Sequence, residues 1–150
     1  MSRFVFSLRV FVPLLWMGVI LGISFLETPL KFTAPGITTP LGLGIGRIMF
    51  TALAITGAVL LVILTIAALL PRRESTGGLV LIGAMWVVLA VQALVVRPLL
   101  AARSDVIIAG GDPGESFLHY GYIALELVLL ALLLAYAIRV VRGIRLEARA

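Results

Sequence analysis

The stretch that decides the fold is residues 116–142, SFLHYGYIALELVLLALLLAYAIRVVR. It predicts an apolar helix that carries the only histidine of the chain, His119, and a carboxylate, Glu126. His119, Tyr122 and Glu126 share one helical stripe, because steps of three and seven residues return to nearly the same face. An ionisable group at membrane depth costs roughly 2.5 kcal/mol or more, so it usually faces protein or a water-filled cavity. Glu126 is therefore the most informative residue of the sequence.

The composition indicates an integral membrane protein. Hydrophobic residues make up 62% of the 150 residues and charged residues 13%, whereas soluble domains carry about 25% charged residues. The formal net charge of +5 comes mainly from arginines near the predicted helix ends, where they anchor and orient spans. No basic run is interleaved with aromatic residues, so nucleic-acid binding is a poor interpretation. The absence of cysteine excludes disulfides, thiolate metal sites and a cysteine nucleophile.

Four apolar segments predict a single integral membrane domain, residues 1–150, folded as an all-α antiparallel bundle of four transmembrane helices. The expected spans are about 10–28, 48–70, 79–96 and 116–138. Each is close to the length that crosses the hydrocarbon layer. Gly18 and Gly22 form a G-x-x-x-G face on the first span. Such a face lets another backbone approach closely, either within the bundle or between protomers.

The segments between the spans predict loops and turns. Residues 27–47 contain three prolines and four glycines, which argue against a continuous helix. This segment is expected to be either an interfacial, partly re-entrant loop or a plain extramembrane loop. Residues 71–78 predict a short turn between antiparallel neighbours, and residues 97–115 predict a polar loop with a turn cluster. Ser116 is the expected N-cap of the fourth span.

Basic residues predict the orientation. Eight lie on the side of the chain ends, and four lie on the other side with most of the acids. The first set is Arg3, Arg9, Arg72, Arg73, Arg139, Arg142, Arg145 and Arg149; the second is Lys31, Arg47, Arg97 and Arg103. Because basic residues favour the cytoplasmic side, both termini are expected in the cytoplasm. The expected location is the bacterial inner (plasma) membrane.

Seven polar residues from all four predicted spans fall in the outer half of this bundle: Glu27, Arg47, Gln92, Arg97, His119, Tyr122 and Glu126. Two interpretations stay open. In the first, Arg97 or Arg47 neutralises Glu126 as a buried pair that fixes the register of the helices. In the second, the seven residues form a ligand-binding site, a pocket open to the outside that takes a proton, a metal ion or a polar head group.

Catalytic chemistry and metal binding have little support in the sequence. No Ser/His/Asp set is credible, because Ser104 and Asp105 fall in a predicted loop with no nucleophile elbow. Glu126 as a general acid or base stays open. His119 and Glu126 lie about 10.5 Å apart along the helix axis, so one ion cannot easily reach both. Haem would need a second axial ligand. No cofactor is identified, and the metal question stays open.

Three segments carry a resemblance: residues 22–32 (GISFLETPLKF), 46–50 (GRIMF) and 117–120 (FLHY). They place a proline and an aromatic after the first span, a Gly-Arg pair at the start of the second, and a histidine at the start of the fourth. The chain thereby resembles small four-span membrane proteins of unsettled function, similar to transmembrane protein two-hundred-and-five and the copper-resistance D membrane domain. The resemblance implies a four-helix bundle and gives weight to Arg47 and His119. Because the chain has no methionine- or histidine-rich loop, a copper role is not carried over, and no enzyme activity is implied.

The sequence therefore predicts a non-enzymatic membrane protein that binds or transports a small molecule or ion. The alternative is a structural or accessory subunit of a larger membrane complex. The lipid bilayer is the expected partner, and a homo-oligomer or a larger membrane complex is compatible with the pattern.

Overall fold

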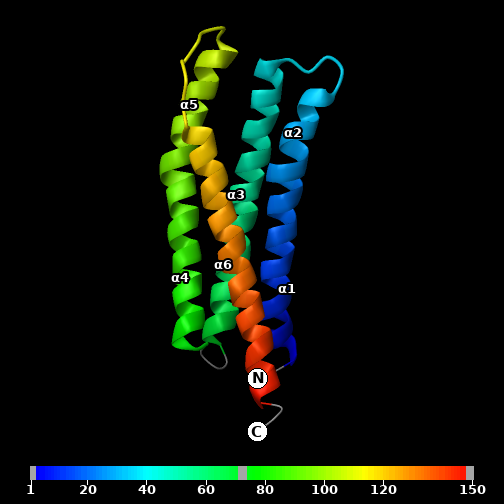
Figure 1. Cartoon of the computed structure of the whole chain (residues 1–150), viewed down its shortest axis with the longest axis vertical. Helices are drawn as coiled ribbons and strands as arrows, with labels where there is room; N and C mark the ends of the chain where they lie inside the picture. Colours follow the sequence, from blue (N-terminus) through cyan, green and yellow to red (C-terminus); the bar gives the residue numbers. More distant parts are fainter. Residues whose placement is uncertain (1–2, 71–73, 148–150) are drawn as a thin grey trace.

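The computed structural model describes residues 3–70 and 74–147, and within them it contains helices and no strand. In these residues, four helical stretches are long and apolar enough to cross a membrane: Phe4–Thr33, Thr39–Leu69, Thr76–Ile108 and Leu118–Gly143. The prediction of an all-α protein with four such helices is confirmed. The chain ends lie together at one end of the elongated bundle (Figure 1), called the terminal end here. The opposite, distal end carries the connections 34–38 and 109–117.

Two of the four stretches combine several helical types. The first is α1 (Arg3–Ile20), the π-helix η1 (Leu21–Glu27), α2 (Thr28–Leu30) and the 3₁₀-helix η2 (Lys31–Thr33). The third is α4 (Thr76–Val91), the π-helix η3 (Gln92–Val96) and α5 (Arg97–Ile108). The second and fourth are single helices, α3 (Thr39–Leu69) and α6 (Leu118–Glu147). α1 and α4 each pack against both α3 and α6.

The two predicted loops, 27–47 and 97–115, are helical over most of their length, so the loop predictions were wrong there; the expectation that 27–47 is not one continuous helix is confirmed, because residues 34–38 interrupt it. In both, a π-helix comes just before a proline. The N–H of Thr28 bonds to the carbonyl of Ile23 ahead of Pro29, and the N–H of Arg97 bonds to Gln92 ahead of Pro98. A proline in a regular helix crowds the carbonyl four residues earlier. A local π turn relieves this conflict, which is how membrane helices tolerate proline.

The start of α3 shows why proline and glycine did not exclude a helix there. Pro40 lies in the first turn, where a missing N–H costs nothing. The Thr38 hydroxyl caps this turn by accepting from the N–H of Leu41 at 3.4 Å. A Cβ added at Gly42 would meet the ring of Phe32, and one added at Gly46 would lie 3.0 Å from Lys31 Nζ. These glycines let the end of the first stretch approach α3 closely.

Other boundaries also differ from the predicted spans. α6 begins at Leu118, whose N–H donates to Ser116 Oγ at 3.1 Å, so Ser116 satisfies an N-terminal donor as expected. α6 continues beyond residue 138 to Glu147. Gly18 and Gly22 have no atom within 4 Å of an added Cβ; of the two expectations for this face, close packing within the bundle is therefore not found in the described chain.

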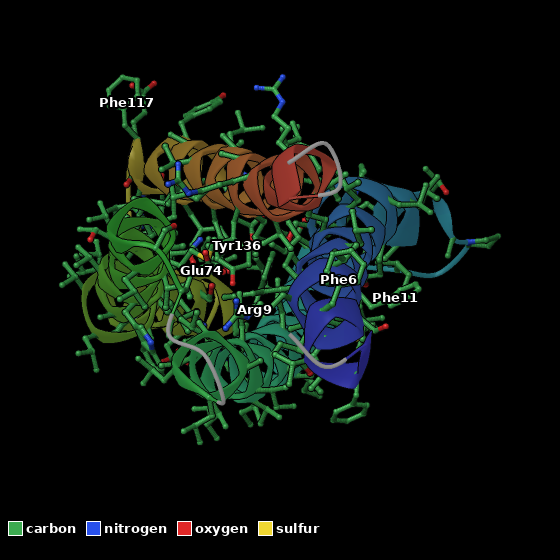
Figure 2. The ribbon with its side chains drawn as sticks, turned by 90° about the horizontal axis from the view of Figure 1, so that it is seen from below. Phe6, Arg9, Phe11, Glu74, Phe117 and Tyr136 are labelled. Atoms are coloured by element: carbon green, nitrogen blue, oxygen red, sulfur yellow. The ribbon has the colours of Figure 1, made fainter. Side chains whose placement is uncertain are left out.

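A buried ion pair closes the terminal end. Arg9, only 4% exposed, donates to the carbonyls of Ala67 and Ala68 at 2.8 and 3.2 Å and to Glu74 Oε2 at 2.9 Å. Those two carbonyls belong to the last turn of α3, which has no intrahelical partners for them. Figure 2 shows Arg9, Glu74 and the buried Tyr136 of α6 at the centre of the bundle.

Around this ion pair, Arg139 of α6 donates twice to Ser75 Oγ, at 3.2 Å each. Ser75 is the N-cap of α4, where it accepts from the N–H of Gly78. Together with Arg9 and Glu74, these contacts join all four helical stretches at the terminal end. Of the basic residues that predict the orientation, Arg72, Arg73 and Arg149 lie outside the described residues, as does part of the predicted turn 71–78.

Candidate functional site

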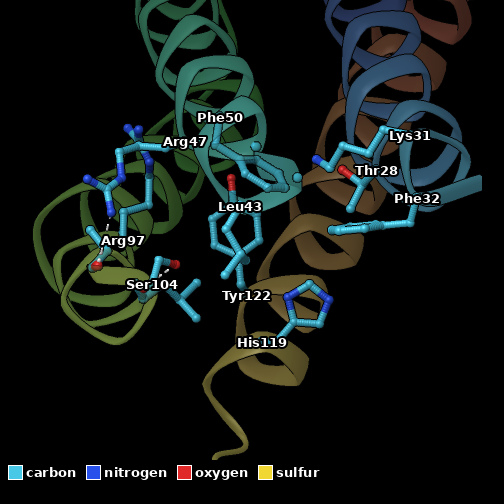
Figure 3. A pocket seen from close by; sticks show the side chains of 14 residues that line it. Thr28, Lys31, Phe32, Leu43, Arg47, Phe50, Arg97, Ser104, His119 and Tyr122 are labelled. Carbon is cyan, nitrogen blue, oxygen red and sulfur yellow. Dashed lines mark hydrogen bonds between the residues drawn. The ribbon is translucent and has the colours of Figure 1, made fainter. Parts of the chain in front are cut away.

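A cavity of about 250 Å³ lies at the distal end, between the end of the first stretch, α3, α5 and α6 (Figure 3). Its volume is close to the lower limit of small-molecule sites. Its polar lining consists of Thr28, Lys31, Arg47, Arg97, Ser104, His119 and Tyr122. Its apolar lining consists of Phe32, Gly42, Leu43, Gly46, Phe50, Leu100 and Ala101. Among the described residues, three cationic side chains and no carboxylate line this distal cavity.

Lys31 enters the distal cavity from η2. Its side chain is only 9% exposed, and Nζ lies 3.5 Å from Glu27 Oε2. The same ammonium lies 5.6 Å from the ring centroid of Phe32 and 6.0 Å from that of Phe50, within the range of cation–π attraction. Glu27 therefore does not line the cavity but contacts a residue that does.

The two arginines of the cavity differ in their partners. Arg47 Nη2 lies 2.6 Å from Asp105 Oδ1, an ion pair in which both side chains are largely exposed. Arg97 instead donates from Nη2 to the Thr51 hydroxyl at 2.8 Å, and it forms no ion pair with any described carboxylate. Arg97 is thus the cation of the cavity whose charge is not matched within the described chain.

α6 supplies the face of the cavity nearest the bundle centre. Tyr122 is buried and packs edge-on against Phe50, with the ring centroids 5.3 Å apart. His119, one turn closer to the distal end, is exposed. In Figure 3 both side chains lie between the cationic groups of the first stretch and those of α3 and α5.

Glu126, one turn below Tyr122, is 2% exposed. Its Oε1 accepts from the Ser24 hydroxyl at 2.8 Å, and its Oε2 has no hydrogen-bond partner among the described residues. Neither Arg97 nor Arg47 forms an ion pair with it in the part of the chain that the structure describes. The interpretation of Glu126 as half of a buried pair with one of these arginines was therefore wrong.

Gln92, 4% exposed, lies beside Glu126, and its Nε2 also has no partner within the described chain. Gln92, Arg97, Tyr122 and Glu126 help to line a second cavity of about 10 Å³, roughly the space of one water molecule. Both residues that flank Glu126 come from the π-helices: Ser24 from η1 and Gln92 from η3. π turns are frequent at functional sites.

The structure thus distributes the seven predicted site residues over two connected places. Arg47, Arg97, His119 and Tyr122 line the distal cavity, and Gln92 and Glu126 line the small one, which Arg97 and Tyr122 share. Glu27 lines neither. Within the described residues, no group of three or more His, Asp or Glu side chains could hold a metal ion.

Four polar residues at these two places were missed: Ser24, Thr28, Lys31 and Ser104. The first three follow one another at steps of four and three residues, a helical stripe that the sequence displays. The predicted first span ends at residue 28, just before Pro29, so this stripe was not predicted to continue to Lys31. Ser104 lies seven residues after Arg97, a spacing that places both on one helical face once α5 is known to be a helix.

Comparisons of the chain with models of protein families, with curated proteins and with solved structures gave no match. The resemblance carried by residues 22–32, 46–50 and 117–120 therefore stays a prediction. What the two cavities do must be inferred from their geometry.

Proposed function

We propose that this protein binds a small anion, or the anionic group of an amphipathic molecule, in the distal cavity and serves in its binding or transport. The observation that supports this most strongly is the convergence of Lys31, Arg47 and Arg97 on one cavity whose described lining has no carboxylate. Guanidinium groups recognise phosphate and carboxylate through paired hydrogen bonds. The apolar part of the lining favours an anion that carries a hydrocarbon body.

We further propose that the bundle is antiparallel, with both termini in the cytoplasm of a bacterial inner membrane. The eight-to-four distribution of basic residues supports this orientation. The distal cavity then opens to the outside, where it can take its ligand from the periplasm or from the outer leaflet of the bilayer. Reporter fusions at each terminus test this, and a periplasmic signal from either terminus would contradict it.

Binding can be tested by calorimetry on the detergent-purified protein, with butanesulfonate as the probe. Replacing Arg97 by Gln should weaken binding about tenfold or more, since a hydrogen bond to a charged group contributes about 1.5–3 kcal/mol. The matched control is Arg142→Gln, because Arg142 is exposed on α6 near the terminal end. Equal affinity in the wild type and Arg97→Gln, or no binding to the wild type, would overturn the proposal.

The source of the anion is tested separately. Phosphatidylglycerol in nanodiscs should displace butanesulfonate if the natural ligand is a lipid head group. Phosphatidylcholine nanodiscs serve as the control for hydrophobic contact alone. If neither lipid competes while butanesulfonate binds, the ligand is a soluble anion.

The second candidate function, an accessory subunit of a larger membrane complex, is favoured by the face formed by Gly18 and Gly22. No atom of the described chain lies within 4 Å of a Cβ added at either glycine, so this face is open to a neighbouring helix. Light scattering after purification in a mild detergent tests this alternative. A monomeric mass would argue against it.

A further inference from the structure

We infer that Glu126 is a proton-binding site linked to the distal cavity, so that the protein takes up one proton together with the anion. This inference rests on the proposed anion binding and adds the identity of the co-bound ion. It assigns separate roles to two places: the distal cavity receives the anion, and Glu126 below it receives the proton.

The first argument is that no described cation forms an ion pair with Glu126. The side chain is 2% exposed, and the Ser24 hydroxyl donates a hydrogen bond to its Oε1. The nearest arginine along the bundle axis, Arg97, is bonded to Thr51 instead. A buried carboxylate needs a compensating partner, which is a cation or a proton. Because no described cation pairs with it, the proton is the remaining partner.

The second argument is a polar connection between the two places. Arg97 and Tyr122 line both the distal cavity and the small one. Glu126 Oε2 and Gln92 Nε2, both buried and unpartnered within the described chain, border the small cavity. One water molecule in a space of that size would bridge such groups. The Tyr122 hydroxyl both donates and accepts, so protons can pass between Glu126 and the distal cavity.

The sign of the linkage follows from charge. An ionised Glu126 places a negative charge below the anion and repels it, whereas a protonated Glu126 does not. Protonation therefore strengthens anion binding, and by reciprocity anion binding favours protonation. The proton comes from solvent and is held on the carboxylate, so no other reactant is needed.

Other groups must be excluded as the source of the effect. Facing Glu126, the titratable or charged groups are Tyr122 on α6 and Arg97 on α5. Among the described residues, the rest of the small cavity's lining contains no titratable side chain: it consists of Trp16 and Ile20 from α1, Leu53 and Ala54 from α3, Leu89 from α4, Gln92 and Ala93 from η3, and Leu129 from α6. The distal cavity adds Lys31 beside Glu27, Arg47 beside Asp105, and His119. His119 is the competing candidate, because its protonation would also strengthen anion binding.

The experiment measures proton uptake with a pH indicator while butanesulfonate is added to weakly buffered, detergent-purified protein. This sulfonate exchanges no proton itself, so any uptake comes from the protein. The wild type should take up close to one proton per bound anion, within a limited pH window. Glu126→Gln should bind the anion with no uptake, and above that window about a hundredfold more tightly than the wild type. His119→Gln should retain the uptake, whatever its effect on affinity.

The possible outcomes separate the two proposals. Binding without uptake in the wild type, or uptake that persists in Glu126→Gln, overturns the proton site and leaves anion binding intact. Uptake that disappears only in His119→Gln moves the proton to His119 and also overturns it. No binding to the wild type overturns both proposals together.

A second measurement covers the case in which Glu126→Gln does not fold. Infrared difference spectra should show a protonated-carboxyl band that grows when butanesulfonate is added. The band should shift in frequency in Glu126→Asp and stay unchanged in His119→Gln. If adding the anion changes no carboxyl band, the inference is wrong.

Discussion

Arg9 and Glu126 are buried to nearly the same extent, 4% and 2% exposed, at opposite ends of the bundle. Arg9 donates to two backbone carbonyls and to the carboxylate of Glu74. Glu126 has one hydroxyl donor and an oxygen without a partner in the described chain. Burial alone therefore does not distinguish a charge that holds helices together from one that is available to a ligand. The two kinds of charge differ in the number and the charge of the groups that are bonded to them.

The surroundings of the two charges differ in the same way. At the terminal end, helix ends, an N-cap and an ion pair join directly. At the distal end, two π-helices and several glycines leave an open space between cations. The comparison predicts that mutations at the terminal end mainly reduce stability, whereas those at the distal end mainly change binding.

The largest expected effect is that of Arg9→Met. It leaves Glu74, whose side chain is 14% exposed, without its cation, and it removes the donor from the carbonyl of Ala67, whereas the carbonyl of Ala68 still accepts from the N–H of Glu74. Breaking a buried pair from one side costs about 3–5 kcal/mol. Unfolding in mixed detergent micelles measures this loss. Adding Glu74→Gln should recover part of it, and an Arg9→Met protein as stable as the wild type would refute the comparison.

The next effect is expected for Gly57→Ala. A Cβ at Gly57 would lie 2.9 Å from Cζ2 of Trp16, which is 1% exposed and cannot move away easily. Overpacking of this kind costs about 1–3 kcal/mol. The matched control is Gly44→Ala on the same helix, since no atom lies within 4 Å of its added Cβ. It should be neutral or slightly stabilising in the same unfolding assay, and equal losses in the two variants would contradict the packing argument.

A smaller loss is expected for Ser24→Ala, which removes the hydrogen bond that the Ser24 hydroxyl donates to Glu126 Oε1. A single hydrogen bond contributes about 1 kcal/mol, and the adjacent small cavity gives the freed oxygen room to find another partner. Ser24→Thr, which keeps the hydroxyl, should retain most of the stability. A loss for Ser24→Ala as large as that for Arg9→Met would show that Glu126 is mainly structural.

The smallest expected value is the coupling energy between Glu126 and Arg97. Residues that share a cavity couple by about 0.5–3 kcal/mol; because Glu126 and Arg97 share the small cavity but form no ion pair, their coupling energy should stay at the lower limit of this range, about 0.5 kcal/mol. The double-mutant cycle uses the two single variants, the double variant and the wild type, all unfolded in the same detergent. Large losses in both single variants that the double variant restores would reinstate the buried pair.

The sequence predicted the helices because their signal is the long apolar run itself. It also predicted the stripe of His119, Tyr122 and Glu126, since positions within one regular helix follow from spacing. What it missed depends on departures from regularity. The prolines of residues 27–47, Pro29 among them, argue against a continuous helix, and the turn cluster of residues 97–115 predicts a loop; in both segments a π turn before a proline lets the helix continue. A hydropathy pattern shows where a charged residue lies but not which group it bonds to. The hydrogen bonds of Arg9 to α3 and its ion pair with Glu74 were therefore not predicted either.

The bond between Ser24 and Glu126 shows the same limit. The two residues are 102 positions apart in the chain, and the π turn sets the direction in which Ser24 faces. No local pattern specifies that direction. By contrast, the polar stripe of Ser24, Thr28 and Lys31 can be recognised in the sequence. A predicted helix that continues through Pro29 would place this stripe at the distal cavity.

Each π-helix accommodates one more residue than an α-helix of the same rise. A one-residue insertion or deletion is therefore the length change that the helix can accommodate at this place. Removing one residue from Leu21–Glu27 would restore regular winding and leave everything beyond it on its present face, because the π turn holds the extra residue within the same rise. Thr28 and Lys31 would keep their places at the distal cavity, and the side chains inside the π turn, Ser24 among them, would change direction. A length change that an alignment records as a single gap would therefore remove the hydroxyl group beside Glu126 without altering the walls of the distal cavity.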